Sequence, residues 1–261
     1  MDITKELTIV IPVRIDSIER KENLDTVISF FMNYTFAHLI VLEGDDKQRY
    51  KYNKTERRLS QHFIKDNDPI FHRTRYLNQL LKLSKTNIVG VWDTDVLVRS
   101  SQIIHSVNAI KAGSTMSFPY DGRFLFVDVE KSIEFRKDCY SFMENYQGKK
   151  IRPISWRPSV GGAFIVNRDK YLKAGGENET FYGWGPEDVE RVKRMEILGE
   201  RIDRVNGLLF HLHHPRYINS LPIEGAIGRN NTKELLTICQ MSRDSLIDYI
   251  KKWPIKMNFK E

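Results

Sequence analysis

The chain has 261 residues, with 41% hydrophobic side chains, 29% charged side chains and a formal net charge of +7. That length and apolar content suffice for one full hydrophobic core, and two cysteines are too few for a disulfide framework. The basic residues are spread along the chain and no DNA- or RNA-binding motif occurs, so we expect no nucleic-acid partner. Because no apolar run approaches the ~18 residues of a membrane span and no signal peptide is present, we expect a cytoplasmic protein.

Short apolar runs rich in β-branched residues predict five strands, at 7–13, 38–42, 88–92, 124–127 and 163–167. The charged segment 43–52 follows the second run. We expect it to form an exposed loop, with the acids Glu43, Asp45 and Asp46 in solvent or, alternatively, in contact with a ligand at the neighbouring sheet edge.

Helices are predicted at 130–146, 189–198 and 232–253, the last capped by Asn231 or Thr232. The second helix has apolar residues three or four positions apart, which predicts one buried apolar face, at Val189, Val192, Met195 and Leu198. Alternation of strands and helices indicates an α/β fold, a mixed sheet flanked by helices in a single domain.

Two acids follow the predicted strand 88–92, in Asp93-Thr94-Asp95. Carboxylates at the end of a strand can reach one cation where the chain turns, and Mn²⁺ or Mg²⁺ prefers such oxygen ligands and can bridge them to a diphosphate. Open α/β sheets also bind ligands at the carboxyl ends of their strands. An isolated Asp-x-Asp often arises by chance, so a turn or a solvated strand end is the alternative.

The segment Phe181-Tyr-Gly-Trp-Gly-Pro-Glu-Asp188 places an aromatic residue between two glycines, directly before a predicted helix. Trp184 in such a loop is suited to stacking on a sugar ring. Pro186 fits the first helical position, so Glu187 and Asp188 lie near the positive end of the helix dipole. These acids either serve a site or only help the helix to start.

Three of the seven histidines, at 211, 213 and 214, fall within four residues. This density favours a metal site or a role in proton transfer. His211 and His214 can converge on one ion if the chain turns, as Pro215 suggests. The pattern leaves open whether His213 contributes and whether the ion is the one that Asp95 would bind.

Several of these motifs together resemble one enzyme family. Gly161-Gly162-Ala163-Phe164, the segment 181–188 and His211-x-x-His214 are similar in order and spacing to the carboxyl-terminal module of galactosyltransferases, as in animal β-1,4-galactosyltransferases and bacterial family 2 relatives. Ile11-Pro12-Val13-Arg14 and Phe71-His72-Arg73 resemble the family's first strand and its nucleotide-contacting segment. The resemblance implies the GT-A fold (a Rossmann-like mixed sheet), a nucleotide sugar, a divalent metal and inversion of the anomeric carbon.

By position, the resemblance implies roles for individual residues. The metal ligands would be Asp95, His211 and His214, and Asp188 would be the catalytic base. The nucleotide sugar would contact Pro12, Val13, Arg14, Phe71, Arg73, Asp93, Gly162 and Trp184. The acceptor would contact Tyr182, Trp184, Glu187 and Asp188. Three positions depart from the family, with His211 in place of a methionine ligand, Pro186 in place of a glycine, and Val189 in place of a third acid.

We therefore expect a Mn²⁺- or Mg²⁺-dependent inverting glycosyltransferase. It would move a hexose or N-acetylhexosamine, with galactose favoured, from a UDP-sugar to a saccharide or lipid-linked saccharide in bacterial surface polysaccharide synthesis. Residues 1–110 would form the nucleotide half, 111–220 the acceptor and catalytic half, and 221–261 a helical extension. The tail 249–260 interleaves aromatic residues with lysines, which suits peripheral contact with the inner face of the membrane or, alternatively, packing on the core.

Two alternatives come from other classes of protein. A metal-dependent hydrolase could use the same acids and histidines, but the Gly-Trp-Gly loop and the arginines Arg14 and Arg73 argue against it. A non-catalytic carbohydrate-binding protein could stack sugars on Trp184 and Tyr182, but this leaves the Asp-x-Asp and His-x-x-His pairs without a purpose.

Overall fold

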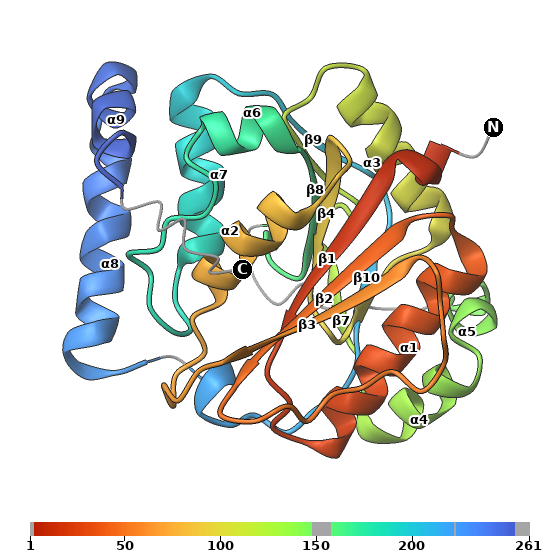
Figure 1. The fold of residues 1–261 in the computed structure, drawn as a ribbon. Helices are drawn as coiled ribbons and strands as arrows, with labels where there is room; N and C mark the ends of the chain where they lie inside the picture. Colours follow the sequence, from red (N-terminus) through yellow and green to blue (C-terminus); the bar gives the residue numbers. More distant parts are fainter. Residues whose placement is uncertain (1–2, 148–157, 222, 254–261) are drawn as a thin grey trace.

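The computed structural model describes residues 3–147, 158–221 and 223–253 of the chain. Within these residues the central sheet (Figure 1) has seven strands in the order β3 (Leu59–Lys65), β2 (His38–Asp45), β1 (Leu7–Val13), β4 (Ile88–Trp92), β8 (Ala163–Asn167), β6 (Met116–Phe118) and β9 (Ile202–Arg204). β1 to β4 run parallel, whereas β8 is antiparallel to both of its neighbours. A second sheet has three strands in the order β5 (Val96–Leu97), β10 (Leu209–His211) and β7 (Phe124–Phe126).

Helices cover both faces of the large sheet (Figure 1). One side carries α1 (Ile18–Tyr34), α3 (Ser100–Lys111), α4 (Val129–Lys137) and α5 (Cys139–Asn145). The other side carries α2 (Arg73–Leu83), α6 (Arg168–Lys173) and α7 (Glu187–Leu198), with α8 (Gly225–Cys239) and α9 (Arg243–Ile250) packed outside α7. Two short 3-10 helices span Ile3–Glu6 and Ile218–Ser220.

The mixed α/β architecture and all five predicted strands are confirmed. Every residue of β1 is buried, because helices cover both faces of the parallel part of the sheet, and such strands have continuous apolar sequences. Five further strands, β3, β5, β6, β9 and β10, were not predicted. β3 is a polar edge strand with all seven of its side chains at least partly exposed, and the other four have only two or three residues.

Two helix predictions were wrong. The segment 130–146 is broken at Asp138, whose side chain accepts a hydrogen bond from the Ser141 N–H and so starts α5. The segment 232–253 is likewise two helices. Because α8 already begins at Gly225, Asn231 and Thr232 lie inside it and are not caps.

The buried faces of two other segments also differ from the prediction. On α7, Val189 is 42% exposed, and the buried side consists mostly of charged residues, Glu187, Glu190, Arg191 and Arg194, with Met195. In the segment 43–52, Glu43 and Asp45 belong to β2 and are buried, whereas Asp46 is exposed as predicted. The buried Glu43 carboxylate accepts hydrogen bonds from the backbone N–H groups of Arg49 and Tyr50, so it fixes the backbone of the loop that follows β2.

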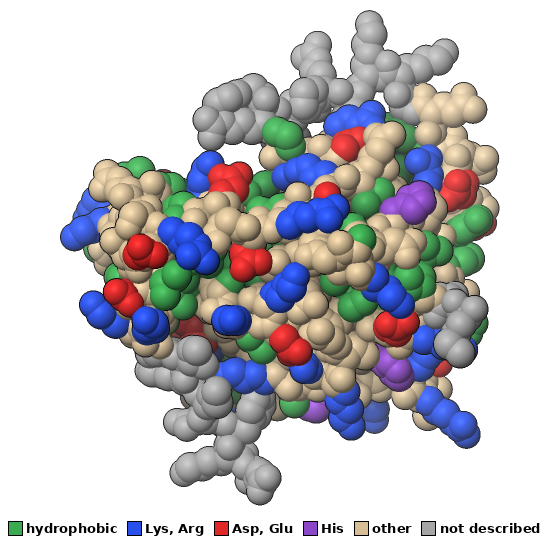
Figure 2. All heavy atoms as spheres, turned by 90° about the horizontal axis from the view of Figure 1, so that it is seen from above, with side chains coloured by type: hydrophobic (Ala, Val, Ile, Leu, Met, Phe, Trp, Pro, Cys, Tyr) green, Lys and Arg blue, Asp and Glu red, His purple; other side chains and the backbone are tan. Residues whose placement is uncertain are grey.

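The described part of the basic aromatic tail packs on the protein. Tyr249 donates a hydrogen bond to Glu234, and the Trp253 ring lies 5.2 Å from the Arg194 guanidinium. The remaining residues of the tail prediction, 254–260, lie outside the described residues. None of the described helices is long and apolar enough to span a bilayer. On the face seen in Figure 2, Lys and Arg side chains are interspersed with Asp and Glu and do not gather in one patch.

Candidate active site

The small sheet brings Asp95 and His211 together. β5 begins directly after Asp95, at the carboxyl end of β4. It pairs with β10 in antiparallel register, with His211 opposite Val96, and the Leu212 N–H donates to the Asp95 carbonyl oxygen at 2.8 Å. Backbone pairing therefore holds the Asp-x-Asp and His-x-x-His segments side by side.

Asp95, His211 and His214 form one cluster. His214 Nε2 lies 3.2 Å from one Asp95 carboxylate oxygen, and His211 Nε2 lies 3.6 Å from the other. One ligand atom from each residue falls within 4.8 Å of the others. Two imidazoles and a carboxylate suit a divalent first-row metal ion, so the three residues fit the predicted ion. His213 is not a member of this cluster, and its N–H donates to Ser132 Oγ.

Protonation in this cluster favours metal binding. Burial lowers the pKa of His211 to about 4, so the imidazole is neutral at pH 7 and has a free lone pair. Burial acts to raise the pKa of Asp95, but His211, His214 and Arg20 together hold that pKa below its usual value. His214 Nδ1 lies 2.8 Å from the Pro215 carbonyl oxygen and 3.2 Å from Arg20 Nη2, so it can donate to the first or accept from the second, depending on its tautomer. In the tautomer with the proton on Nδ1, Nε2 is free to bind a metal.

Arg20 is a site residue that the sequence analysis missed. It lies in the first turn of α1, with Nη1 3.4 Å from Asp95 Oδ2 and Nη2 3.2 Å from His214 Nδ1. It also donates to Ser220 Oγ at 2.9 Å. The only signal in the sequence is the spacing of four residues from Asp16, its ion-pair partner, and such pairs are common on helix surfaces.

All of the predicted nucleotide-sugar residues except Gly162 line a cavity of about 170 Å³. Arg14 uses Nε and Nη1 to bind backbone carbonyl groups, but its buried Nη2 has no hydrogen-bond partner among the described residues. Arg73 Nη2 donates to Asp93 at 2.7 Å, and its Nη1 is likewise without a hydrogen bond. Unpaired guanidinium N–H groups in a cavity suit phosphate or nucleotide oxygens. The walls of the cavity include Pro12, Val13, Arg14, Phe71, Arg73, Asp93, Asp95, Trp184, Glu187, Asp188, His211 and His214.

A larger cavity of about 1230 Å³ adjoins the first. The two share wall residues, among them Trp184 and Asp188. Gly162 lies on the wall of the larger one with a φ of +83°, and a Cβ there would come within 3.0 Å of the Phe124 ring. Only glycine combines this backbone conformation with so close an approach. The arrangement provides two adjoining compartments with Asp188 at their boundary.

The loop before α7 is held in place by α8. The Tyr182 N–H donates to Asn231 Oδ1 at 3.3 Å, and Asn231 Nδ2 donates to the Tyr182 carbonyl oxygen at 3.0 Å. Trp184 is thereby presented to both cavities and remains 47% exposed. Tyr182 lines neither of these two cavities, and its hydroxyl donates to Asp68 at 2.5 Å. Its contact with an acceptor stays a prediction.

The two acids that begin α7 have different environments. Glu187 is buried, and the Gly185 N–H donates to its carboxyl group at 3.1 Å. Burial, and then the charge of Asp188, raise the pKa of Glu187 to about 8, so this residue is protonated at pH 7. A protonated carboxyl group can donate a hydrogen bond to a hydroxyl group but cannot accept its proton. Asp188 is therefore the candidate base.

Asp188 is fixed from both sides. Its Oδ1 accepts a hydrogen bond from Arg191 Nη1 at 2.7 Å and lies 3.9 Å from Arg73 Nη1. Its Oδ2 lies against the backbone of Gly161, where an added Cβ would come within 2.7 Å. Gly161 therefore leaves the space that the carboxylate occupies.

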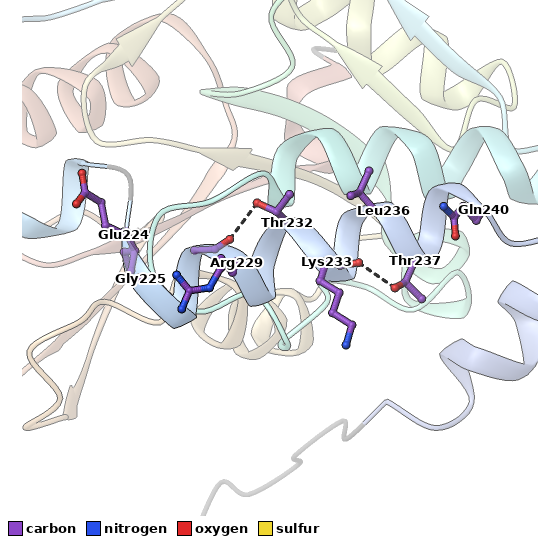
Figure 3. Close-up of a pocket in the computed structure, with 10 residues that line it drawn as sticks. Glu224, Gly225, Arg229, Thr232, Lys233, Leu236, Thr237 and Gln240 are labelled. Carbon is purple, nitrogen blue, oxygen red and sulfur yellow. Dashed lines mark hydrogen bonds between the residues drawn. The ribbon is translucent and has the colours of Figure 1, made fainter.

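An open hollow of about 710 Å³ follows the exposed face of α8 (Figure 3). Its threonines are already satisfied by their own helix, since the Thr232 and Thr237 hydroxyls donate to the carbonyl oxygens of Gly228 and Lys233. It contains no residue predicted for the site and no cluster of metal ligands among the described residues. We assign no chemistry to it.

Comparison with known proteins agrees with this geometry. Residues 147–216 match the family model described as the N-terminal domain of galactosyltransferase. The crystal structure of Drosophila β-1,4-galactosyltransferase 7 with manganese, UDP-Gal and xylobiose has a TM-score of 0.55 and 15% identity, covering 90% of this chain and 79% of that one. The chain has the GT-A glycosyltransferase fold. Together with the family match, this fold supports the assignment of the chain as a glycosyltransferase.

Other GT-A structures show the same similarity. Glucosyl-3-phosphoglycerate synthase from Mycobacterium tuberculosis, solved with Mn²⁺, UDP and phosphoglyceric acid, has a TM-score of 0.50 and 16% identity, covering 90% of this chain and 78% of that one. A further structure of that enzyme contains Mg²⁺ and UDP, with a TM-score of 0.51 and 15% identity, covering 90% of this chain and 79% of that one. The similar structures thus contain the two metals expected here.

Proposed function

We propose that the protein is a metal-dependent inverting glycosyltransferase, which moves a hexose or N-acetylhexosamine from a UDP-sugar to a saccharide. One observation carries this proposal. The cluster of Asp95, His211 and His214 and the candidate base Asp188 line the same cavity, although they come from distant parts of the chain. A galactose-type sugar is favoured by the family match over residues 147–216.

The roles of the residues follow from charge. Cleavage of the bond between sugar and diphosphate leaves negative charge on the diphosphate, which the unpaired N–H groups of Arg14 and Arg73 are placed to bind. A divalent ion held by Asp95, His211 and His214 would supply further stabilisation of that charge. These residues would hold the diphosphate leaving group in the smaller cavity.

The acceptor would bind in the larger cavity. Trp184 would stack on its ring at the boundary of the two cavities, and protonated Glu187 would donate a hydrogen bond to an acceptor hydroxyl. Asp188 would accept the proton of the attacking hydroxyl, with its carboxylate held by Arg191. Attack from the side opposite the leaving group inverts the anomeric carbon.

The assignment of the chain's parts belongs to the same proposal. Residues 1–110 would chiefly hold the nucleotide, residues 111–220 the acceptor and the base, and residues 221–261 would support the Trp184 loop through Asn231. A lipid-linked acceptor at the inner face of the membrane, in surface polysaccharide synthesis, would suit a cytoplasmic enzyme of this kind.

The test is a panel of UDP-galactose, UDP-N-acetylgalactosamine and UDP-glucose, each with Mn²⁺ and with or without saccharide acceptors. UDP release that depends on acceptor and stops with a chelator is expected. Equal release with and without acceptor would support a hydrolase. Binding of saccharide with no release from any donor would support a carbohydrate-binding protein.

A further inference from the structure

Hydrogen bonds connect Asp188 Oδ1 to two buried residues of the protein core, Arg191 and Glu177. The donor to Asp188, Arg191, is fully buried although it is charged. Arg191 Nη2 donates to Glu177 Oε2 at 2.8 Å, and its Nε lies 3.1 Å from Glu177 Oε1. This two-point contact fixes the plane of the guanidinium group, so its third nitrogen, Nη1, can point at Asp188 in only one way.

The other contacts of Arg191 and Glu177 keep both residues in place. The Tyr171 hydroxyl donates to Glu177 Oε1 at 2.8 Å, and the Arg191 guanidinium lies 4.3 Å from the centre of the Phe164 ring. Asn78 holds the Glu177 backbone from both sides, since its Oδ1 accepts from the Glu177 N–H and its Nδ2 donates to the Glu177 carbonyl oxygen. The glutamate therefore cannot move without disturbing α2.

We propose that the buried pair of Glu177 and Arg191 positions the catalytic base. In this view, which rests on the proposed function, Glu177 and Arg191 hold the Asp188 carboxylate in the narrow space beside Gly161, where it meets the acceptor hydroxyl. Neither Arg191 nor Glu177 lines either site cavity, and the hydrogen bond from Arg191 to Asp188 connects this pair to the cavity wall.

The same helix offers a matched control. Arg194 and Glu190 form a second buried pair on α7, with Arg194 Nε 2.7 Å from Glu190 Oε1. Arg194 also binds the carbonyl oxygens of Ala174 and Gly176, but this pair makes no contact with Asp188. Glu177→Gln and Glu190→Gln thus each weaken the buried ion pair of one α7 arginine, and only the pair of Glu177 and Arg191 is hydrogen-bonded to the base.

The experiment compares kcat, UDP affinity and Tm of these two variants with the unaltered protein. For Glu177→Gln we expect kcat to fall about 10- to 100-fold, as for other partners that orient a reacting group, with UDP affinity changed by no more than about twofold. Glu190→Gln should lower Tm by a similar amount but keep kcat within about twofold. Equal losses of kcat in the two variants, or an unchanged kcat in Glu177→Gln, would overturn the positioning role.

Two further measurements keep the test decisive. If Glu177→Gln does not fold, Tyr171→Phe can replace it, because this change removes one hydrogen bond from the same pair. The kcat of Tyr171→Phe should fall about fivefold, and an unchanged kcat would contradict the proposal. If the unaltered protein transfers no sugar, the proposed function has failed but the positioning role has not. Crystal structures then decide it. The Asp188 carboxylate should leave its place beside Gly161 in Glu177→Gln and keep it in Glu190→Gln, and an unmoved carboxylate in the first variant refutes the role.

Discussion

Replacement of Asp188 by asparagine is the sharpest test of the proposed mechanism. The asparagine carbonyl oxygen can still accept the hydrogen bond from Arg191, and its amide group fits the space that Gly161 leaves, so the fold should persist. The variant loses the ability to take a proton, together with the negative charge that pairs with Arg191 and lies 3.9 Å from Arg73 Nη1. Turnover should therefore fall about 10²- to 10⁴-fold, which corresponds to about 2.7 to 5.4 kcal/mol of activation free energy.

The assay is acceptor-dependent UDP release at saturating donor, with UDP affinity measured by calorimetry. Asp169→Asn is a matched control, because Asp169 lies in the first turn of α6, is exposed, and pairs with Arg168 away from both cavities. If Asp188 only helped α7 to start, the two variants would behave alike. Near-normal turnover in Asp188→Asn would refute its role as the base.

Asp95→Ala and His214→Ala should each abolish transfer without unfolding the protein, as circular dichroism can check, and activity that survives excess chelator would exclude a metal role. Because Glu187 has a pKa of about 8 when folded but about 4.5 when unfolded, the folded state retains a proton that the unfolded chain loses. The free energy of unfolding should therefore fall as pH rises from about 5 to 8, and Glu187→Gln should flatten that fall in denaturant titrations; parallel pH profiles would contradict the burial argument. Trp184→Ala should raise the acceptor KM about tenfold and weaken donor binding less than that, and a larger loss of donor binding would contradict acceptor stacking. Amide exchange of residues 182–185 should slow when Mn²⁺ and the donor are added together but not with acceptor alone, and a loop that is equally protected in the apo protein would contradict closure.

The sequence allowed the central strands to be predicted because their burial on both faces demands continuous apolar residues. β3 lies at an edge and carries polar side chains, so it lacked that pattern. The break at Asp138 was missed because the helical spacing of apolar residues continues across it. Only the hydrogen bond from the Ser141 N–H to the Asp138 side chain marks the start of a new helix. Apolar patterns therefore predicted the buried central strands more readily than the ends of the helices.

The candidate site was predictable as separate motifs but not as a whole. Asp-x-Asp and His-x-x-His each suggest metal ligands, yet only the pairing of β5 with β10 brings them together. These strands are far apart in the sequence, so no local pattern indicates that they pair. The charged side of α7 was missed for a related reason. Periodicity marks apolar residues as buried, whereas Arg191 is buried because Glu177, from another segment, neutralises it.

The position of His211 opposite Val96 gives a metal ion a second effect. An ion bound to Asp95 and His211 would cross-link two strands whose hydrogen-bonded register is only two residues long. Opening of β5 and β10 would then require release of the ion. At a concentration about 100 times its dissociation constant, this adds about 2.7 kcal/mol to the free energy of that opening. The supply of divalent metal would thus govern how long this corner of the protein stays closed, and with it the resistance of the chain to proteases, even when no sugar is being transferred.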